Sequence, residues 1–334
     1  MADKCYDGEP DQTSKVMHPL VKALFSAWEW RPEVVIVLLV MGTLYVTGWW
    51  RLHKRPQPAK LASKRRLAAY LSGLALLTIS LLSPVDILGS QLFFMHMVQH
   101  MLMVMVAAPL LWLGEPFSIG LWGLPPQPRR WVGHLFAHDA RFRCFLHATS
   151  GPGAAWLIFI CVFVGWHDPN AYNLAQGREW AHDLEHISFF VTALLFWWHI
   201  VGAAPHLHGR VSVWVRLAML IGVIPVNMIA GIVIATASEI IYTYYLTVPH
   251  LWGFTALEDQ AIGGVIMWVS GSEMIVWGVV FLLAGFAKQD DKPLVIVPNW
   301  DSEENMVAPG LEHRVVQNKW RRLKTAKPHT SDAG

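Results

Sequence analysis

Seven long apolar segments constrain the fold of this 334-residue chain more than any other feature. A helix needs roughly 20 mostly apolar residues to cross the hydrocarbon core of a bilayer. Only 15% of the residues are charged, compared with about 25% in soluble domains. We therefore expect an all-α fold, a polytopic membrane bundle of seven transmembrane helices. The predicted helices cover residues 33–50, 67–84, 91–113, 145–166, 184–202, 214–236 and 262–286.

The fourth segment differs from the others because Gly151, Pro152 and Gly153 interrupt it. Glycine and proline together favour a kink or a break in a membrane helix. This segment is expected either to cross as a kinked helix or to start late, after a re-entrant turn.

The distribution of lysine and arginine predicts the orientation, because these residues gather in cytoplasmic loops. Seven lie in the loop 51–66, four between the third and fourth segments, and eight after the seventh. The opposite loops, 85–90, 167–183 and 237–261, contain none, one and none. The four basic residues of segment 1–32 weigh mildly against this contrast without reversing it. The predicted topology has the N-terminus outside and the C-terminus in the cytoplasm.

Three regions follow from this topology. Residues 1–32 form an extracytoplasmic N-terminal segment, with an amphipathic surface helix expected near His18–Trp30 and no removable signal peptide. Residues 33–286 form the seven-helix membrane domain. Residues 287–334 form a polar cytoplasmic tail.

Two histidines four residues apart, His96 and His100, lie within the third apolar segment. Positions i and i+4 share one face of a helix, and polar side chains inside a lipid-spanning helix are costly enough to indicate function. Imidazole and thioether groups together suit a soft metal such as copper. Five methionines accompany the pair: Met95, Met97, Met101, Met103 and Met105.

Further histidines are expected near the same depth on the extracytoplasmic side. His182 and His186 form a second i, i+4 pair before the fifth segment, and His167 follows the fourth. With Asp259, these residues would converge with His96 and His100 into a transition-metal site within the bundle.

Other side chains are predicted to support the site. Asp183 and Glu185 would orient the imidazoles, and Gln99 would do the same or line a polar route. Met101 and Gln260 complete this supporting set. The alternative is that the histidines only join helices by hydrogen bonds and that the methionines only fill space.

Several classes of protein are excluded. Cys5, Cys144 and Cys161 show no paired spacing, which argues against thiol redox chemistry, a cysteine copper chaperone and covalent haem attachment. The seventh segment has no lysine for a retinal Schiff base. Phosphate-binding glycine loops, HExxH and GxSxG are absent from the sequence, and nothing in it indicates a nucleic-acid partner.

Several short motifs occur in a fixed order over about residues 85–285. They are His96-Met97-Val98-Gln99-His100-Met101-Leu102, Ala108-Pro109-Leu110-Leu111, Leu113-Gly114-Glu115-Pro116, His167-Asp168-Pro169-Asn170-Ala171-Tyr172, Leu184-Glu185-His186, Phe196-Trp197-Trp198, Tyr244-Tyr245, Asp259-Gln260-Ala261-Ile262-Gly263-Gly264 and Met267-Trp268. These motifs resemble those of the CtaG-type cytochrome c oxidase assembly factors, polytopic proteins of bacterial cell membranes that are distinct from the single-span copper chaperone of similar name. His199 departs from the pattern, because an apolar residue or proline is expected there.

The resemblance implies a non-enzymatic role in maturing a haem-copper oxidase in the bacterial inner membrane. The leading hypothesis is copper handling, with oxidase subunits as partners and a periplasmic copper chaperone as a candidate donor. Anionic membrane lipid is a candidate partner of the basic loop 51–66. The alternatives are a b-type cytochrome that binds haem b through imidazoles such as His100 and His186, a copper transporter, and a pure scaffold.

Overall fold

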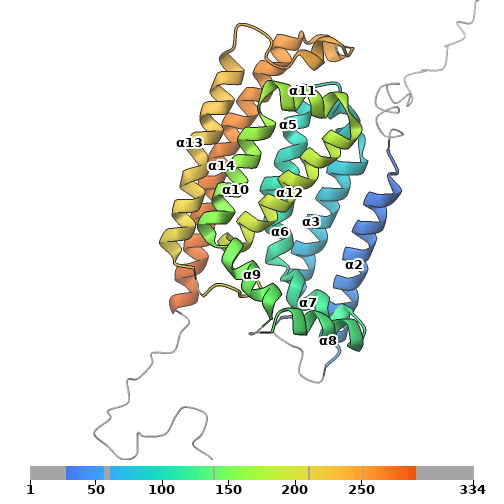
Figure 1. Ribbon diagram of the computed structural model, residues 1–334, viewed down its shortest axis with the longest axis vertical. Coiled ribbons are helices and arrows are strands. Elements are labelled where there is room, and N and C mark those ends of the chain that lie inside the picture. The colour runs from blue at the N-terminus through green and yellow to red at the C-terminus, as the bar shows by residue number, and fades with distance from the viewer. Residues whose placement is uncertain (1–27, 56–60, 138–139, 210, 250, 291–334) are drawn as a thin grey trace, which may run out of the picture. The chain divides into compact units, whose positions relative to one another are not determined.

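The computed structural model describes residues 28–55, 61–137, 140–209, 211–249 and 251–290. Over these residues the chain forms helices joined by turns and loops, with no β-strand, which confirms the predicted all-α membrane bundle (Figure 1). The helices are α2 (Pro32–His53), α3 (Lys64–Leu82), α4 (Pro84–Gly89), α5 (Phe93–Met101), the π-helix η1 (Leu102–Ala107), α6 (Ala108–Leu113), α7 (Pro116–Gly123), α8 (Pro126–Leu135), α9 (Arg141–Thr149), α10 (Pro152–Trp166), α11 (Pro169–Gly177), α12 (Glu179–Val201), α13 (Val213–Thr236), the 3₁₀ turns η2 (Thr243–Leu246) and η3 (Leu251–Gly253), and α14 (Ala256–Asp290).

Six of these helices are long and apolar enough to cross a membrane, and α9 with α10 makes a seventh if the pair counts as one span. The axes of α9 and α10 differ by 64°. The break falls at Ser150 and Gly151, where the sequence predicts a kink or a late start.

The chain divides into two compact units, Met1–Ala284 and Gly285–Gly334. The first contains the helices described here as far as Ala284. The predicted surface helix near His18–Trp30 lies outside the described residues except for its last three, which are not helical. The predicted tail 287–334 also lies outside them, apart from the end of α14.

Proline and short polar caps fix where many helices begin. Proline lacks a backbone N–H, so it fits the first turn, where that group has no partner inside the helix. The Ser83 hydroxyl accepts the Val85 amide of α4, and the Asp168 carboxylate accepts the Asn170 and Ala171 amides of α11. Six helices start at proline: α2, α4, α7, α8, α10 and α11.

The third span, α5–η1–α6, is irregular because of Pro109. Proline cannot donate to the carbonyl four residues earlier, and it disturbs the turn before it. The amide of Ala108 bonds to Met103 O instead of Val104 O, which is the π-helical pattern. The freed Val104 carbonyl accepts a hydrogen bond of 2.8 Å from the indole Nε1 of Trp197 in α12. The third span and α12 are thereby linked deep in the bundle.

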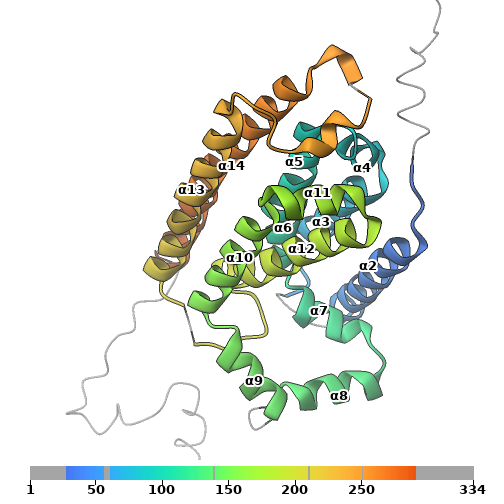
Figure 2. The ribbon, with the colours of Figure 1, turned by 45° about the horizontal axis from the view of Figure 1, so that its top comes forward.

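Other parts of the chain cover little of helix α2, and its main packing partner is α7 (Figures 1 and 2). Two glycines permit this contact. A Cβ atom at Gly48 would collide with the carbonyl of Ile119, and one at Gly123 would collide with the carbonyl of Leu44. The backbones therefore approach as closely as small residues allow in membrane helix pairs.

Replacing Gly123 by alanine is expected to separate α2 from α7. The new methyl group meets backbone rather than a movable side chain, so we expect a loss of about 1–3 kcal/mol in the free energy of unfolding. Gly120→Ala is the matched control, because a Cβ atom there meets nothing within 4 Å. Unfolding of the detergent-solubilised variants measures the difference, and equal stability of the two would contradict this packing argument.

Candidate metal centre

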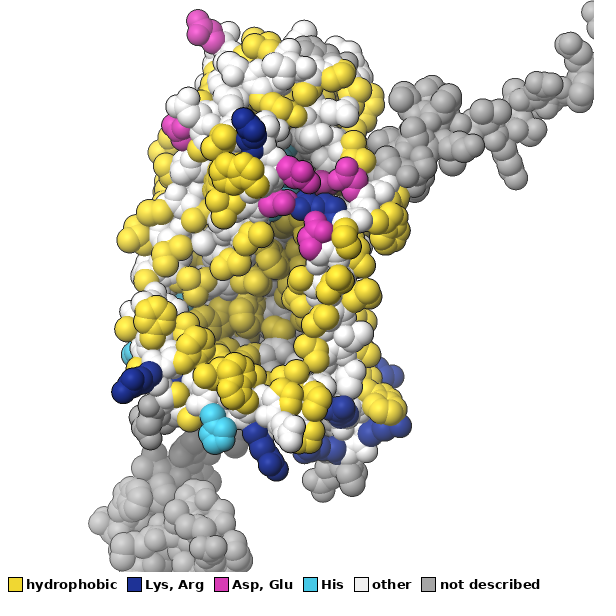
Figure 3. Space-filling model, turned by 45° about the vertical axis from the view of Figure 1, so that its right-hand side comes forward, with side chains coloured by type: hydrophobic (Ala, Val, Ile, Leu, Met, Phe, Trp, Pro, Cys, Tyr) yellow, Lys and Arg dark blue, Asp and Glu magenta, His cyan; other side chains and the backbone are white. Residues whose placement is uncertain are grey.

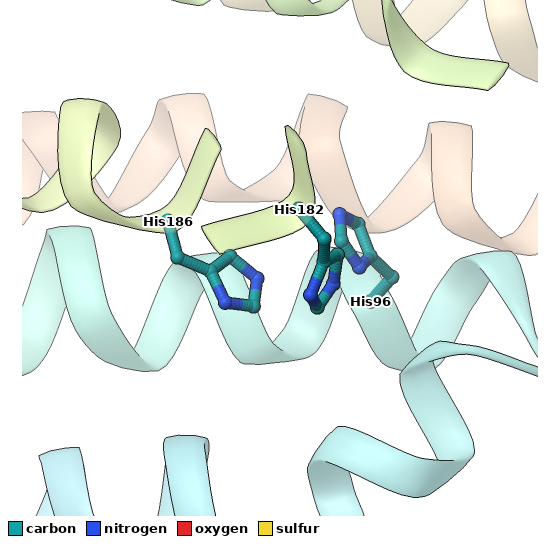
Figure 4. Close-up of side chains that lie close together, drawn as sticks. All are labelled: His96, His182 and His186. Atoms are coloured by element: carbon teal, nitrogen blue, oxygen red, sulfur yellow. The ribbon is translucent and has the colours of Figure 1, made fainter. Parts of the chain in front are cut away.

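Four imidazoles and one carboxylate meet where α5 and α12 lie side by side. His96 and His100 come from α5, while His182, Glu185 and His186 come from α12. In each helix the histidines stand four residues apart, so each pair shares a face. Figure 4 shows His96 from one helix and His182 and His186 from the other directed into the same space.

The first group of donor atoms is a triangle formed by His96, His100 and Glu185. The two Nε2 atoms are 2.7 Å apart, and each is 3.5 Å from the Glu185 Oε1 atom. Donor atoms around a four-coordinate metal with bonds of about 2.0–2.1 Å lie about 3.3 Å apart. Only the contact between the two imidazoles must open slightly for the triangle to hold an ion.

The second group consists of His96, His182 and His186, whose donor atoms all lie within 4.8 Å of one another. The ring of His182 is 4.2 Å from that of His186 and 5.5 Å from that of His96. The rings of His100 and His186 are 5.1 Å apart. His96 belongs to both groups, so the five side chains form one cluster, which we call the His–Glu cluster.

The centre of the cluster is buried, and several of its donor atoms are unpaired. His96 and Glu185 are 0% and 1% exposed, whereas His100 and His182 are partly buried. Among the described residues, no hydrogen-bond partner is found for four buried side-chain atoms of the cluster, and an unpaired buried polar atom is costly. A metal ion is one group that would satisfy several of them together. These atoms are His100 Nδ1, His182 Nε2, His186 Nε2 and Glu185 Oε2.

Gln176 is a neighbour of the cluster that the sequence analysis did not identify. Its amide nitrogen lies 3.3 Å from Nδ1 of His96 and 3.4 Å from Nε2. It comes from α11, a short helix outside the apolar segments. A polar residue six positions before His182 was the only signal in the sequence, and that signal is weak.

His167 is placed beside the cluster and outside both groups of donor atoms. Its Nδ1–H donates to the carbonyl of Phe163 at 2.6 Å, which leaves Nε2 as the nitrogen with a lone pair. Burial lowers the pKa of His167 to about 4, although the bond to Phe163 acts in the opposite direction. Nε2 is buried without a partner, and His167 lines the same cavity as His100 and Met101.

A family model described as the cytochrome c oxidase caa3 assembly factor matches residues 43–289. The chain belongs to this family. The match includes every residue of the His–Glu cluster together with His167, Gln176 and Asp259.

Curated proteins similar to this chain are longer than it is. An uncharacterized protein of Mycobacterium leprae is 28% identical over 83% of this chain and 42% of its own length. An uncharacterized protein of Mycobacterium bovis is 28% identical over 81% of this chain and 41% of its own length. The chain therefore spans about four tenths of the length of these relatives. No solved structure matches it.

Asp259 positions the helix that carries the first histidine pair. Leu92 precedes α5 and has no side-chain acceptor for the first amides of the helix. The Asp259 carboxylate supplies one from α14, accepting Phe93 N at 2.7 Å and Phe94 N at 3.0 Å. The structure thus places Asp259 at the start of α5, whereas the sequence-based expectation grouped it with the imidazoles.

The two glutamines in the predicted supporting set also act on the backbone. Gln99 donates to the carbonyl of Ser80 at 2.8 Å and to Asp86 Oδ1 at 2.6 Å, which ties α5 to α3 and α4. Gln260 accepts Ile241 N at 2.7 Å and donates to Glu239 O, which holds the loop before η2. Gln99 therefore braces α5, which carries His96 and His100, and Gln260 braces the loop that follows α13.

An open pocket of about 670 Å³ reaches the cluster at His182. Asp183, expected to orient an imidazole, instead accepts two hydrogen bonds of 2.7 and 2.8 Å from Arg31 beside this pocket. Figure 3 shows acidic side chains around a basic one in a recess of this face. Burial raises the pKa of Asp86 in the pocket, although the hydrogen bond from Gln99 opposes this. The carboxylates lining the pocket are Glu29, Glu33, Asp86 and Glu179.

His199, the departure from the expected motif, belongs to the break in the fourth span. It is 3% exposed, and its Nε2 donates to the carbonyl of Ser150 at 2.7 Å. Ser150 lies between α9 and α10, where that carbonyl has no helical partner. The histidine therefore satisfies a backbone group that the bend exposes.

Removing the Asp259 carboxylate is expected to destabilise the start of α5, because two backbone amides lose their acceptor. Asp259→Ala leaves the Phe93 and Phe94 amides buried and unpaired, which costs about 1–3 kcal/mol. Asp259→Asn keeps one neutral acceptor and should fall between the alanine variant and the unchanged protein. Unfolding in detergent tests this order, and an alanine variant as stable as the unchanged protein would show that the two bonds contribute nothing.

Proposed function

We propose that this chain is a non-enzymatic maturation factor that holds copper at the His–Glu cluster and passes it to a haem-copper oxidase. The observation that carries the proposal is the gathering of four imidazoles and Glu185 with unpaired, buried donor atoms. The chain belongs to a cytochrome c oxidase assembly family, and this is the reason for proposing an oxidase as the protein that receives the copper.

The donor set favours copper over harder cations. Imidazole binds first-row transition metals well, and copper binds most strongly in that series. Glu185 is 1% exposed, and its Oε1 atom lies 3.5 Å from the Nε2 atoms of His96 and His100. A buried carboxylate needs a positive charge beside it, and a bound copper ion would supply that charge.

The packing of the cluster disfavours haem b. A haem iron with two imidazole ligands needs the porphyrin plane between them. The rings of His100 and His186 are only 5.1 Å apart at their centroids and meet nearly edge to face, at 78°. The other rings of the cluster surround them, which leaves little room for a macrocycle at this position.

The distribution of charge supports a cluster on the extracytoplasmic side of the bacterial inner membrane. On the face in Figure 3, lysine and arginine gather at the end opposite the acidic recess, with apolar side chains between. The positive-inside rule assigns the basic end to the cytoplasm. A cluster near the other end would receive copper from a periplasmic chaperone and deliver it to an oxidase subunit exposed on that side.

Copper binding is expected to depend on the His–Glu cluster. Full-length protein in detergent, loaded with copper and desalted, should retain at least one copper ion per chain by elemental analysis. The His96→Ala/His100→Ala variant should lose most of it, because both groups of donor atoms contain His96. His53→Ala/His134→Ala is the matched control, since both side chains are exposed and outside the cluster. Equal copper in all three proteins would overturn the proposed site.

Cells that depend on this protein provide a second test. Glu185→Gln removes the buried negative charge with little change in size, so we expect weaker copper retention and oxidase of reduced activity and copper content. Glu258→Gln, at an exposed position on α14, should leave both unchanged. Full oxidase activity with the Glu185→Gln variant would contradict a role for this carboxylate in copper delivery.

A further inference from the structure

A cavity of about 50 Å³ adjoins the His–Glu cluster through His100. Four methionines line it: Met97 and Met101 from α5, Met105 from η1 and Met267 from α14. The first three are spaced four residues apart along the third span, so the cavity follows one side of that span. The remaining walls are mainly aromatic and aliphatic, with no carboxylate among them.

Two imidazole nitrogens remain for this cavity. His100 uses Nε2 toward His96 and Glu185, and its Nδ1 is buried without a partner. His167 uses Nδ1 toward the Phe163 carbonyl, and its Nε2 is buried without a partner. A histidine that donates one ring nitrogen to a backbone carbonyl is the usual form of a metal-binding histidine, because the bond fixes the other nitrogen as a lone-pair donor.

The size and chemistry of the cavity select its occupant. Pockets for organic ligands measure about 300–1,000 Å³, whereas about 50 Å³ accommodates an ion or one or two water molecules. Thioethers and neutral imidazoles are soft donors that select copper(I). Without a carboxylate in the walls, a monovalent ion is also less costly to bury than a divalent one.

We propose that this cavity is a second, copper(I) site formed by His100, His167 and the methionine thioethers. The identity of the metal rests on the function proposed above. His100 would belong to both sites, with Nε2 in the His–Glu cluster and Nδ1 in the cavity site. Copper entering at the His–Glu cluster thus has a position with softer donor atoms next to it.

The test is a copper(I) titration of the full chain in detergent, under anaerobic conditions with a chromogenic competitor, combined with X-ray absorption at the copper edge. We expect two copper ions per chain and sulfur neighbours around one of them. Met97→Leu/Met101→Leu should bind one ion with nitrogen and oxygen neighbours only. Leucine approximates the volume of methionine, so the variant should fold.

Two further variants make the titration decisive. Met103→Leu/Met274→Leu replaces buried methionines outside the cavity and should bind two ions with sulfur neighbours. His167→Asn keeps an amide near the Nδ1 position, facing Phe163 O, but has no group at Nε2. It should therefore lose the sulfur-ligated ion independently of the methionines.

The possible outcomes separate this proposal from the preceding one. One copper ion with no sulfur neighbour in the unchanged protein, or an undiminished titration of Met97→Leu/Met101→Leu, would overturn the cavity site and leave the cluster standing. If the unchanged protein binds a single, sulfur-ligated ion and His96→Ala/His182→Ala binds the same, the cluster is not a copper site and the cavity site stands without it, because this variant removes a donor from both groups of the cluster and leaves His100 in place.

Discussion

The bundle depends on one constraint, which is that a polar group inside an apolar environment needs a partner within the protein. The chain meets this constraint in several places by pairing side chains with backbone atoms freed by irregular helices. His199 donates to the Ser150 carbonyl at the α9–α10 break, and Asp259 accepts the first amides of α5. The His–Glu cluster departs from this pattern by its concentration of unpaired atoms, because it holds four of the eight buried side-chain nitrogen and oxygen atoms that have no partner among the described residues.

The two helices that carry the cluster are held by contacts away from it. Pro109 disturbs the third span, and the carbonyl that this frees, Val104 O, receives the Trp197 indole of α12. At the other end of α5, Asp259 supplies the cap that Leu92 cannot provide. The third span and α12 are therefore joined, and α5 is capped, by contacts that do not involve the histidines.

Periodicity and hydropathy predicted the spans, the break near Gly151 and the two histidine pairs, since each depends on residues close in sequence. Contacts between distant elements could not be predicted in this way. Gln176 reaches His96 from a short helix, and Arg31 pairs with Asp183 across 152 positions. Glu185 is a mixed case. Its position beside His186 in the sequence predicted that it lies near the imidazoles, but that its Oε1 atom lies 3.5 Å from His96 Nε2 could be seen only in the structure.

The two proposed sites differ in charge and in the softness of their donor atoms, and each therefore favours a different oxidation state of copper. The His–Glu cluster contains a carboxylate and connects to an open acidic pocket at His182. The adjoining cavity contains thioethers and lacks a carboxylate in its walls. Copper(II), the harder ion, is better stabilised by nitrogen and oxygen donors beside water, and copper(I) by sulfur away from it. If both proposed sites hold copper, copper(I) would therefore favour the cavity and copper(II) the His–Glu cluster, with His100 common to both.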